Sequence, residues 1–282
     1  TVQSLRENDR RLASLMETLD RLGLLDHTDV LLTSDHGFST AGPRRWDGKG
    51  LASLGLEELE DGDETDVATT GQGGAITLGE RSVRHATAIV RHLQALDWVG
   101  AVFTRDDGPA AGLPGTLPLS ALWNGRVGRR APDIRFSIAW SDEANAHGVR
   151  GTVLAGSWNP NAHMDPSSPR AGRRGASHGS ASPFDMRNSL FAWGPSFRRD
   201  LRSAVPAGTV DVAPTIRHLL ALPQVEADGR VLLEALAGSS DTPAVSAETL
   251  DAALPNGSYR QALTLARVGH TSYVVQAQAW RS

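Results

Sequence analysis

Hydrophobic positions recur along the first part of the chain in two periods, one typical of a helix and one typical of a buried strand. Residues 4–23 carry leucines at helical spacing with charged residues between them, and Gly23 is a suitable stop signal. Residues 30–32 follow as a continuous apolar run, the pattern of a strand buried on both faces. A helix that leads directly into a strand predicts an αβ unit, in which helices cover the faces of a sheet.

The same order of elements returns further along the chain. Ser82 is placed to cap a second amphipathic helix, and residues 98–103 follow it as an apolar strand. Residues 134–140 alternate between apolar and polar side chains, as a half-buried strand does, and residues 152–155 are a candidate for another strand. Asp211 is well placed as the N-cap of a third helix. These patterns predict an α/β fold.

Regular patterning is weak in two long stretches, which indicates insertions rather than separate domains. We expect residues 1–282 to form a single domain with loop-rich insertions at about 40–75 and about 105–175. Two strand-like runs near the end predict a C-terminal hairpin at about 260–280, which extends the edge of the domain.

The composition supports a large core and argues against two classes of protein. The chain has 282 residues, 40% of them hydrophobic, and a formal charge of −4, so it lacks the basic surface of a protein that coats nucleic acid. No apolar run approaches the roughly 18 residues of a membrane span, and residues 1–25 are charged and helical, unlike a signal peptide. Because the chain has no cysteine, a metal site must use His, Asp or Glu. The compartment and the oligomeric state stay open.

The most informative polar residues are Asp35 and His36, which come where the strand predicted from the apolar run at residues 30–32 ends, and which precede Gly37. Side chains at the carboxyl ends of strands in open α/β sheets commonly build binding sites. A carboxylate beside an imidazole suits a divalent transition metal such as zinc or manganese. Taken alone, such a pair more often marks an ordinary turn, in which the Asp caps the backbone and the His is exposed.

A polar loop between Ser157 and Pro183 is the second candidate segment, because long loops inside ordered chains often carry sites. It contains His163 and His178, and the residue pattern alone does not choose between them as a metal ligand. Three arginines in the same loop could attract an anionic substrate, although a solvated loop is the simpler interpretation.

Two other polar segments have a plainer interpretation. The acidic cluster in residues 57–66 is mainly expected to be solvated surface, with a secondary cation site as the alternative. The glycine-rich residues 71–74 precede a strand-like run and lack the Lys-Ser/Thr of a phosphate-binding loop, so they predict a tight turn.

Three segments in a fixed order resemble the motifs of one known family. They are Thr-Ser-Asp-His-Gly at residues 33–37, Ala-Ser-His-Gly-Ser at residues 176–180 with Asp185 shortly after, and Val-Asp-Val-Ala-Pro-Thr-Ile at residues 210–216. In this order they resemble the alkaline phosphatase superfamily, specifically its nucleotide pyrophosphatase/phosphodiesterase (type I phosphodiesterase) branch. The resemblance implies an alkaline-phosphatase-like central β-sheet with helices on both faces.

The resemblance also implies a cofactor, namely two divalent metal ions, with zinc preferred. Such a pair clamps the attacking and leaving oxygens during in-line displacement at phosphorus. Asp35 and His36 match ligands of the metal that binds the nucleophile, and His178 matches one ligand of the partner metal. His163 is then left as a supporting or surface residue. Asp211 also matches the family, but we interpret it as structural.

The implied function is hydrolysis of phosphodiester or nucleotide pyrophosphate bonds in a small phosphate ester or nucleotide, through a covalent phospho-enzyme. A phosphomonoesterase, phosphonate hydrolase or sulfatase of the same superfamily is the nearest alternative. A non-catalytic fragment that binds a metal or a partner is the alternative from a different class.

One departure from the family pattern concerns the nucleophile. The family uses a Thr or Ser that opens a helix, and an Asp-x-x-x-His ligand pair ahead of the helix at residues 4–23; neither is matched here. The resemblance therefore covers the carboxyl-terminal half to two-thirds of such an enzyme. We expect the nucleophile and the first part of the sheet to lie upstream of Thr1, and this chain alone to be inactive.

Overall fold

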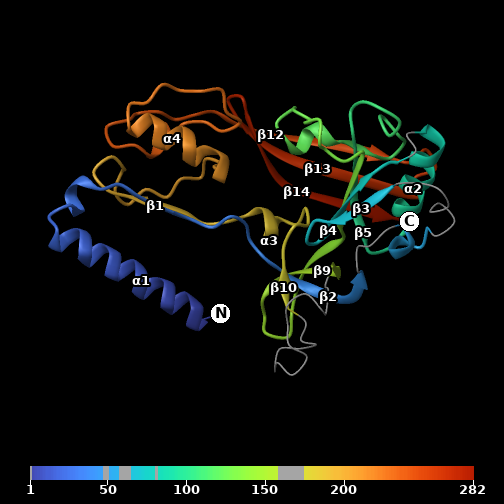
Figure 1. Ribbon diagram of the computed structural model, residues 1–282, viewed down its shortest axis with the longest axis horizontal. Coiled ribbons are helices and arrows are strands. Elements are labelled where there is room, and N and C mark those ends of the chain that lie inside the picture. Colours follow the sequence, from blue (N-terminus) through green and yellow to red (C-terminus); the bar gives the residue numbers. More distant parts are fainter. Residues whose placement is uncertain (1, 47–50, 57–64, 80–81, 158–174) are drawn as a thin grey trace. The chain divides into compact units, whose positions relative to one another are not determined.

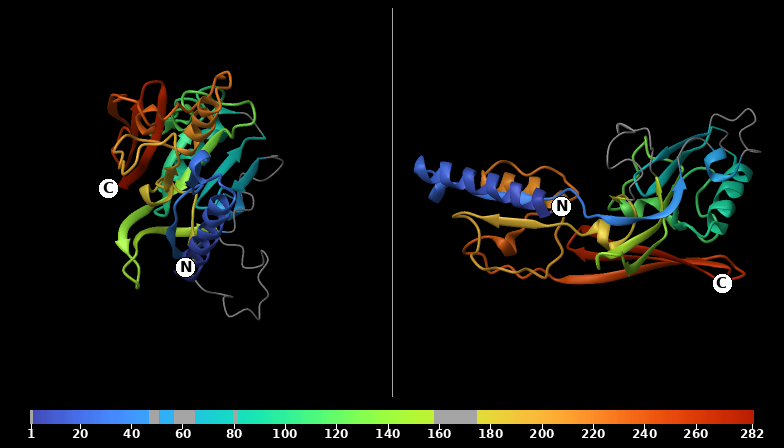
Figure 2. Two further views of the ribbon diagram at one scale, coloured as in Figure 1. Left: turned by 90° about the vertical axis from the view of Figure 1, so that its left-hand side faces the viewer. Right: turned by 90° about the horizontal axis from the view of Figure 1, so that it is seen from below.

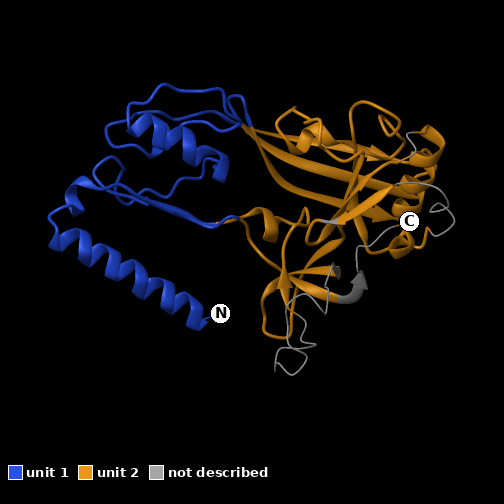
Figure 3. Cartoon of the chain, viewed as in Figure 1, with its two compact units in different colours: residues 1–35, 189–245, 268–271 blue, residues 36–188, 246–267, 272–282 orange. Residues whose placement is uncertain are grey.

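The chain divides into two compact units, each assembled from segments that are distant in sequence (Figure 3). The computed structural model describes residues 2–46, 51–56, 65–79, 82–157 and 175–282. Unit 1 comprises residues 1–35, 189–245 and 268–271, and unit 2 comprises residues 36–188, 246–267 and 272–282. Both units combine helices with strands, so the predicted mixed α/β class is confirmed.

Unit 1 is built around one long helix and one pair of strands (Figures 1 and 2). The first helix and the first strand form where the sequence predicts them. The two strands are antiparallel, with Val30 opposite Trp193 and Thr33 opposite Leu190. The elements of this unit are α1 (Val2–Arg21), η1 (Leu25–His27), β1 (Val30–Thr33), β11 (Leu190–Trp193), η5 (Thr209–Asp211), α4 (Val212–Leu219) and η6 (Leu233–Ala235).

The burial predicted for β1 is wrong. Leu32 on β1 is 44% exposed and Phe191 on β11 is 59% exposed, whereas the apolar run predicts a strand covered on both faces. None of the described residues of α1 is buried either. Among the described strands β1 pairs only with β11. An apolar run shows that its side chains favour burial, but it does not show which elements bury them. In unit 1 the described residues bury them only partly.

Asp211 is structural, as predicted, but it does not cap α4. Its buried carboxylate accepts hydrogen bonds from the backbone N–H of Gly208 and of Arg230, both at 2.8 Å. Beside it, the Arg230 guanidinium forms a double hydrogen bond with Glu234. These contacts join residues 208–211 to residues 230–234.

Unit 2 contains most of the buried apolar side chains, arranged around several sheets (Figure 1). No described helix in either unit is long and apolar enough to cross a membrane. The elements of unit 2 are β2 (Ser39–Trp46), η2 (Ala52–Leu54), β3 (Asp66–Thr69), β4 (Gly73–Thr77), α2 (Val83–Ala95), β5 (Val99–Thr104), β6 (Leu117–Pro118), η4 (Leu119–Leu122), β7 (Ile134–Ile138), β8 (Trp140–Ala144), β9 (Arg150–Ser157), β10 (Ala176–Ser177), α3 (Pro183–Met186) and nearly all of β12 (Val245–Ala253), β13 (Tyr259–Val268) and β14 (Thr271–Arg281).

The central sheet has the strand order β3-β4-β7-β5-β6, and α2 packs against β5. The helix begins at Ser82 as predicted, because the Ser82 Oγ accepts a hydrogen bond from the N–H of His85 at 3.1 Å. Ile89 and Leu93 of α2 are fully buried in one core cluster with Ile76 and Phe136 from the sheet. The strands predicted at residues 98–103, 134–140 and 152–155 correspond to β5, β7 and β9.

A second sheet, β12-β13-β14, contains the long pair β13 and β14 where the sequence predicts a hairpin (Figure 2, red). Among the links to the central sheet are a buried amide and a buried hydroxyl on β13. Gln261 accepts from the N–H of Val102 at 2.7 Å and donates to the carbonyl oxygen of Val102 at 2.8 Å. The Tyr259 hydroxyl donates to the carbonyl oxygen of Gly100 at 2.9 Å. The side chains of β13 thus supply polar partners to the backbone of β5.

The third sheet of unit 2 has the order β10-β2-β9-β8, and sequence patterning did not predict its strand β2. This strand lies in the stretch expected to be loop-rich, and Gly42 and Pro43 interrupt its pattern. Gly42 has a packing reason, since a Cβ there would lie 2.3 Å from the Val153 carbonyl oxygen. Most of the acidic cluster and His163 lie outside the described residues.

Candidate functional site

The pairing of β2 with β10 brings two of the predicted ligands together. In this antiparallel register Ser39 lies opposite Ser177, so the residues just before β2 meet those just after β10. The imidazole rings of His36 and His178 stack with 3.5 Å between their centroids and 14° between their planes. Phe38 contacts both rings edge-on, at centroid distances of 5.0 and 5.6 Å. The two histidines singled out from the sequence therefore share one site in unit 2.

The buried carboxylate of Asp185 holds both histidine loops in place. It accepts a hydrogen bond from the Ser39 hydroxyl at 2.5 Å, and from the hydroxyl and the N–H of Ser180 at 2.6 and 2.9 Å. The carbonyl oxygen of Asp185 also accepts from the N–H of Gly37 at 2.8 Å. Because Gly37 follows His36 and Ser180 comes shortly after His178, one residue of α3 fixes both loops. Sequence reasoning noted Asp185 within a motif but gave it no role.

Each histidine is followed by a glycine that the packing requires. A Cβ on Gly37 would lie 2.0 Å from the carbonyl oxygen of Phe184. Gly179 has a φ of +102°, and a Cβ there would lie 2.2 Å from the carbonyl oxygen of Thr70. Any other residue at either position would push its neighbouring histidine away from the other.

The tight turn predicted at the glycine-rich residues 71–74 lies between β3 and β4, closed by a hydrogen bond from the N–H of Thr70 to the carbonyl oxygen of Gly73, and it supports His178. The N–H of Gln72 donates to the carbonyl oxygen of His178 at 2.7 Å. Gly71, with a φ of +75°, lets this backbone approach closely, because a Cβ there would lie 2.1 Å from the same oxygen. The side-chain amide of Gln72 is fully buried, and neither of its polar atoms has a hydrogen-bond partner among the described residues.

A hydrogen bond orients the His36 ring. Its Nδ1 lies 2.8 Å from the carbonyl oxygen of Gly37, which can only accept a hydrogen bond. Nδ1 is therefore the donor of this bond. Metal-binding histidines are typically oriented in this way, with the second ring nitrogen donating to a carbonyl or carboxylate.

Asp35 is the last residue of the first segment of unit 1, and its side chain is exposed. The backbone just before it is tied to the residue that precedes β11, because the N–H of Ser34 donates to the carbonyl oxygen of Ser189 at 3.1 Å.

The imidazoles of His36 and His178 and the carboxylate of Asp35 are chemically suitable donors for zinc. Within the described ranges, no group of three or more His, Asp or Glu side chains lies close enough to hold a metal ion. The convergence of Asp35 with the two histidines stays a prediction.

Comparison with known proteins supports the family that the first motif suggests, while the motifs at residues 176–180 and 210–216 lie outside the matched residues. A family model described as type I phosphodiesterase / nucleotide pyrophosphatase matches residues 2–166, which include Asp35 and His36. No curated protein matches the chain. Since the family match covers more than half of the sequence, the chain belongs to the type I phosphodiesterase/nucleotide pyrophosphatase family.

Proposed function

We propose that the complete protein is a metal-dependent hydrolase of phosphodiester or nucleotide pyrophosphate bonds, built on an alkaline-phosphatase-like sheet. Membership of the family supports hydrolysis of phosphoric esters in general. The more specific proposal rests on the stacked pair of His36 and His178. Asp185 holds the loops of this pair by bonds to Ser39, near His36, and to Ser180, near His178. A small phosphate ester or a nucleotide is the proposed substrate.

Three residues of this chain would hold the metals. Asp35 and His36 would bind one divalent ion, and His178 would provide a ligand to a second, with zinc the ion that best suits these donors. When bound, the ions would supply Lewis-acid stabilisation of the charge that develops on the phosphoryl, attacking and leaving oxygens. No residue of this chain is assigned as the nucleophile.

The chain's other residues near the site orient these ligands. The carbonyl oxygen of Gly37 accepts a hydrogen bond from Nδ1 of His36 and orients that ring, and Phe38 packs edge-on against both imidazoles. Asp185 fixes the spacing of the two loops, so that neither imidazole has to be ordered when the metal or the substrate binds.

The test is hydrolysis of bis(p-nitrophenyl) phosphate by the complete protein, before and after removal of metal by a chelator. We expect activity to be lost on chelation and restored by zinc. His178→Ala should lower kcat/KM by about 100-fold or more, because it removes one of few metal ligands. His147→Ala removes an exposed imidazole of the same unit and serves as the matched control. Equal activity in the two variants, or activity that survives chelation, would overturn the proposal.

A further inference from the structure

An apolar cavity of about 190 Å³ opens in unit 2 beside the residue that follows His178. Gly179, Ser180 and Ala181 form one part of its lining. The rest comes mainly from large apolar side chains, together with one guanidinium: Phe103, Leu122, Trp123, Met186, Val274 and Arg135. We call this cavity the Arg135 pocket.

Arg135 lies in the middle of the central sheet rather than on its edge. It sits on β7, directly opposite Ala75 of β4 and Phe103 of β5. Cross-strand neighbours share one face of a sheet, so Arg135 lies on the same face as Phe103, which belongs to the second core cluster.

The charge of Arg135 is not compensated within the described residues. Its guanidinium has no hydrogen bond or ion pair to any of them, and burial lowers the pKa of this arginine. A charged group removed from water without a partner destabilises a fold. A half-buried cation that no described acidic side chain pairs is therefore suited to pair with an anion from outside the chain.

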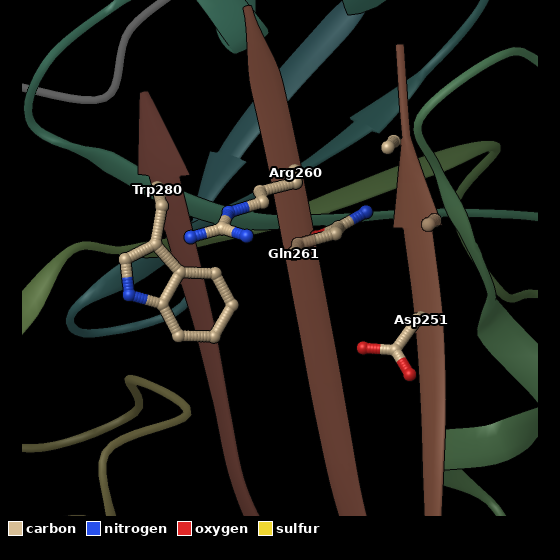
Figure 4. A pocket seen from close by; sticks show the side chains of 6 residues that line it. Asp251, Arg260, Gln261 and Trp280 are labelled. Atoms are coloured by element: carbon tan, nitrogen blue, oxygen red, sulfur yellow. The ribbon is translucent and has the colours of Figure 1, made fainter. Parts of the chain in front are cut away.

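A second arginine of unit 2 shows the contrast. Arg260 lines a hollow on the sheet β12-β13-β14, where its guanidinium lies 5.5 Å from the centre of the Trp280 ring (Figure 4). Its side chain is exposed, so water solvates the charge while the indole face attracts it. Arg260 therefore serves as the control for Arg135: it is an arginine of the same unit whose charge is solvated and lies beside an aromatic ring.

The size and the lining of the Arg135 pocket narrow the class of ligand. An apolar cavity of roughly 150 Å³ accepts a benzene ring, so the Arg135 pocket has room for one ring or a short branched chain. Guanidinium groups bind carboxylate and phosphoryl oxygens in a bidentate manner. A ligand that fits both features has a compact apolar body and a single anionic head.

We propose that the Arg135 pocket binds a small organic anion, with a carboxylate or phosphoryl head on Arg135 and an apolar body against Trp123, Leu122 and Met186. This site goes beyond the proposed hydrolase function, because it requires neither a metal nor the two histidines. A ligand bound there lies next to the loop that carries His178, so it would also restrict that loop.

The test is binding of fluorinated probes to the complete protein, followed by ¹⁹F NMR in the presence of a chelator. The probes are 4-fluorobenzoate, 4-fluorophenylphosphonate and, as a neutral analogue, 4-fluorobenzamide. We expect saturable binding of at least one anion, at least about 10-fold weaker binding of the amide, and a loss of at least about 10-fold in Arg135→Met. Arg260→Met should bind the anions like the wild type. The benzoate and phosphonate arms identify which head group the pocket selects.

The stability of Arg135→Met separates a binding arginine from a structural one. The substitution removes a half-buried charge that has no partner among the described residues, and it fills the same space with an apolar chain, so it should raise Tm by about 2–4 °C. Absence of saturable binding by both anions would overturn the proposal, and so would wild-type binding in Arg135→Met. A lowered Tm with unchanged anion affinity would also do so. None of these outcomes depends on the hydrolase activity, since metal is absent throughout.

Discussion

The imidazole of His178 lies flat on that of His36, with 3.5 Å between the ring centroids, although most of unit 2 separates the two residues in sequence. The register of β2 against β10 brings the two loops together, and Asp185 bonds to Ser39 on one side and to Ser180 on the other. This pair of histidines defines the candidate site. Single substitutions of the residues around it test how each one supports the site.

Asp185→Ala should destabilise the protein and separate the histidines. It would leave the Ser39 hydroxyl and the N–H and hydroxyl of Ser180 buried without their acceptor. Unsatisfied buried groups cost about 1–3 kcal/mol each, so we expect a loss of about 3 kcal/mol or more in the free energy of unfolding, measured by urea denaturation. Asp142→Ala removes an exposed aspartate of the same unit and should change little. Equal midpoints for the two variants would contradict the role given to Asp185.

Gly179→Ala should disturb His178 directly. The alanine Cβ would meet the carbonyl oxygen of Thr70 at 2.2 Å, in a backbone conformation with φ of +102°. We expect a loss of about 2 kcal/mol in unfolding free energy and a marked loss of hydrolytic activity. Gly128→Ala is the control, because a Cβ at that position meets nothing within 4 Å and its φ is not left-handed. Thermal unfolding and hydrolysis of the chromogenic diester, measured on both variants, make the comparison.

Gln72→Leu should stabilise the protein, contrary to the usual effect of a core substitution. Both polar atoms of the Gln72 amide are buried without a hydrogen-bond partner among the described residues. Replacing such an amide with an apolar side chain of similar size should add about 1 kcal/mol to the unfolding free energy. Gln261→Leu should do the reverse, because that amide bonds to Val102 and Gly115. A destabilised Gln72→Leu would show that the buried amide has a bonding partner.

Glu234 should stabilise unit 1 only above acidic pH. Burial by itself would raise the pKa of Glu234, but the hydrogen bonds and charge of Arg230 outweigh burial and lower that pKa below its ordinary value. A carboxyl whose pKa is lower in the folded state stabilises above its unfolded pKa of about 4.3, and this contribution is lost as the pH falls through the folded pKa.

Glu234→Gln should therefore cost about 3 kcal/mol of unfolding free energy near neutral pH, because it leaves the Arg230 charge largely buried. The difference from the wild type should shrink when urea denaturation is repeated at increasingly acidic pH. Glu248→Gln breaks a more exposed pair with Arg267 and should cost no more than about 1 kcal/mol. A penalty for Glu234→Gln that does not change with pH would contradict the lowered pKa.

The sequence predicted those elements that form because of signals within a few residues, such as a helix cap or an amphipathic pattern. The cap at Ser82 and the apolar face of α2 are both sequence-local, and both appear as predicted. The strand β2 was missed because Gly42 and Pro43 break its alternation, while its pairing partners lie far away in the sequence. The exposure of β1 was also missed, since an apolar run reveals nothing about which elements cover it.

The residues of the candidate site also differ in how far the sequence predicts them. Asp35 and His36 stand out because they are adjacent and follow a strand, whereas His178 could be chosen over His163 only through the family resemblance. Asp185 gave no signal of its own, because its role consists of bonds to Ser39 and Ser180 that depend on the folded packing. Likewise, only the folded packing shows that Arg135 has no ionic partner among the residues that the structure describes.

The two-metal site can be tested directly by anomalous diffraction at the zinc absorption edge from crystals of the complete protein grown with zinc. We expect two zinc ions a few ångströms apart. One should lie about 2.0–2.2 Å from a carboxylate oxygen of Asp35 and from Nε2 of His36, and the other at a similar distance from an imidazole nitrogen of His178. Crystals of His178→Ala should show reduced occupancy of the second ion. Zinc bound elsewhere on the protein, with no anomalous peak at these three side chains, would contradict the account.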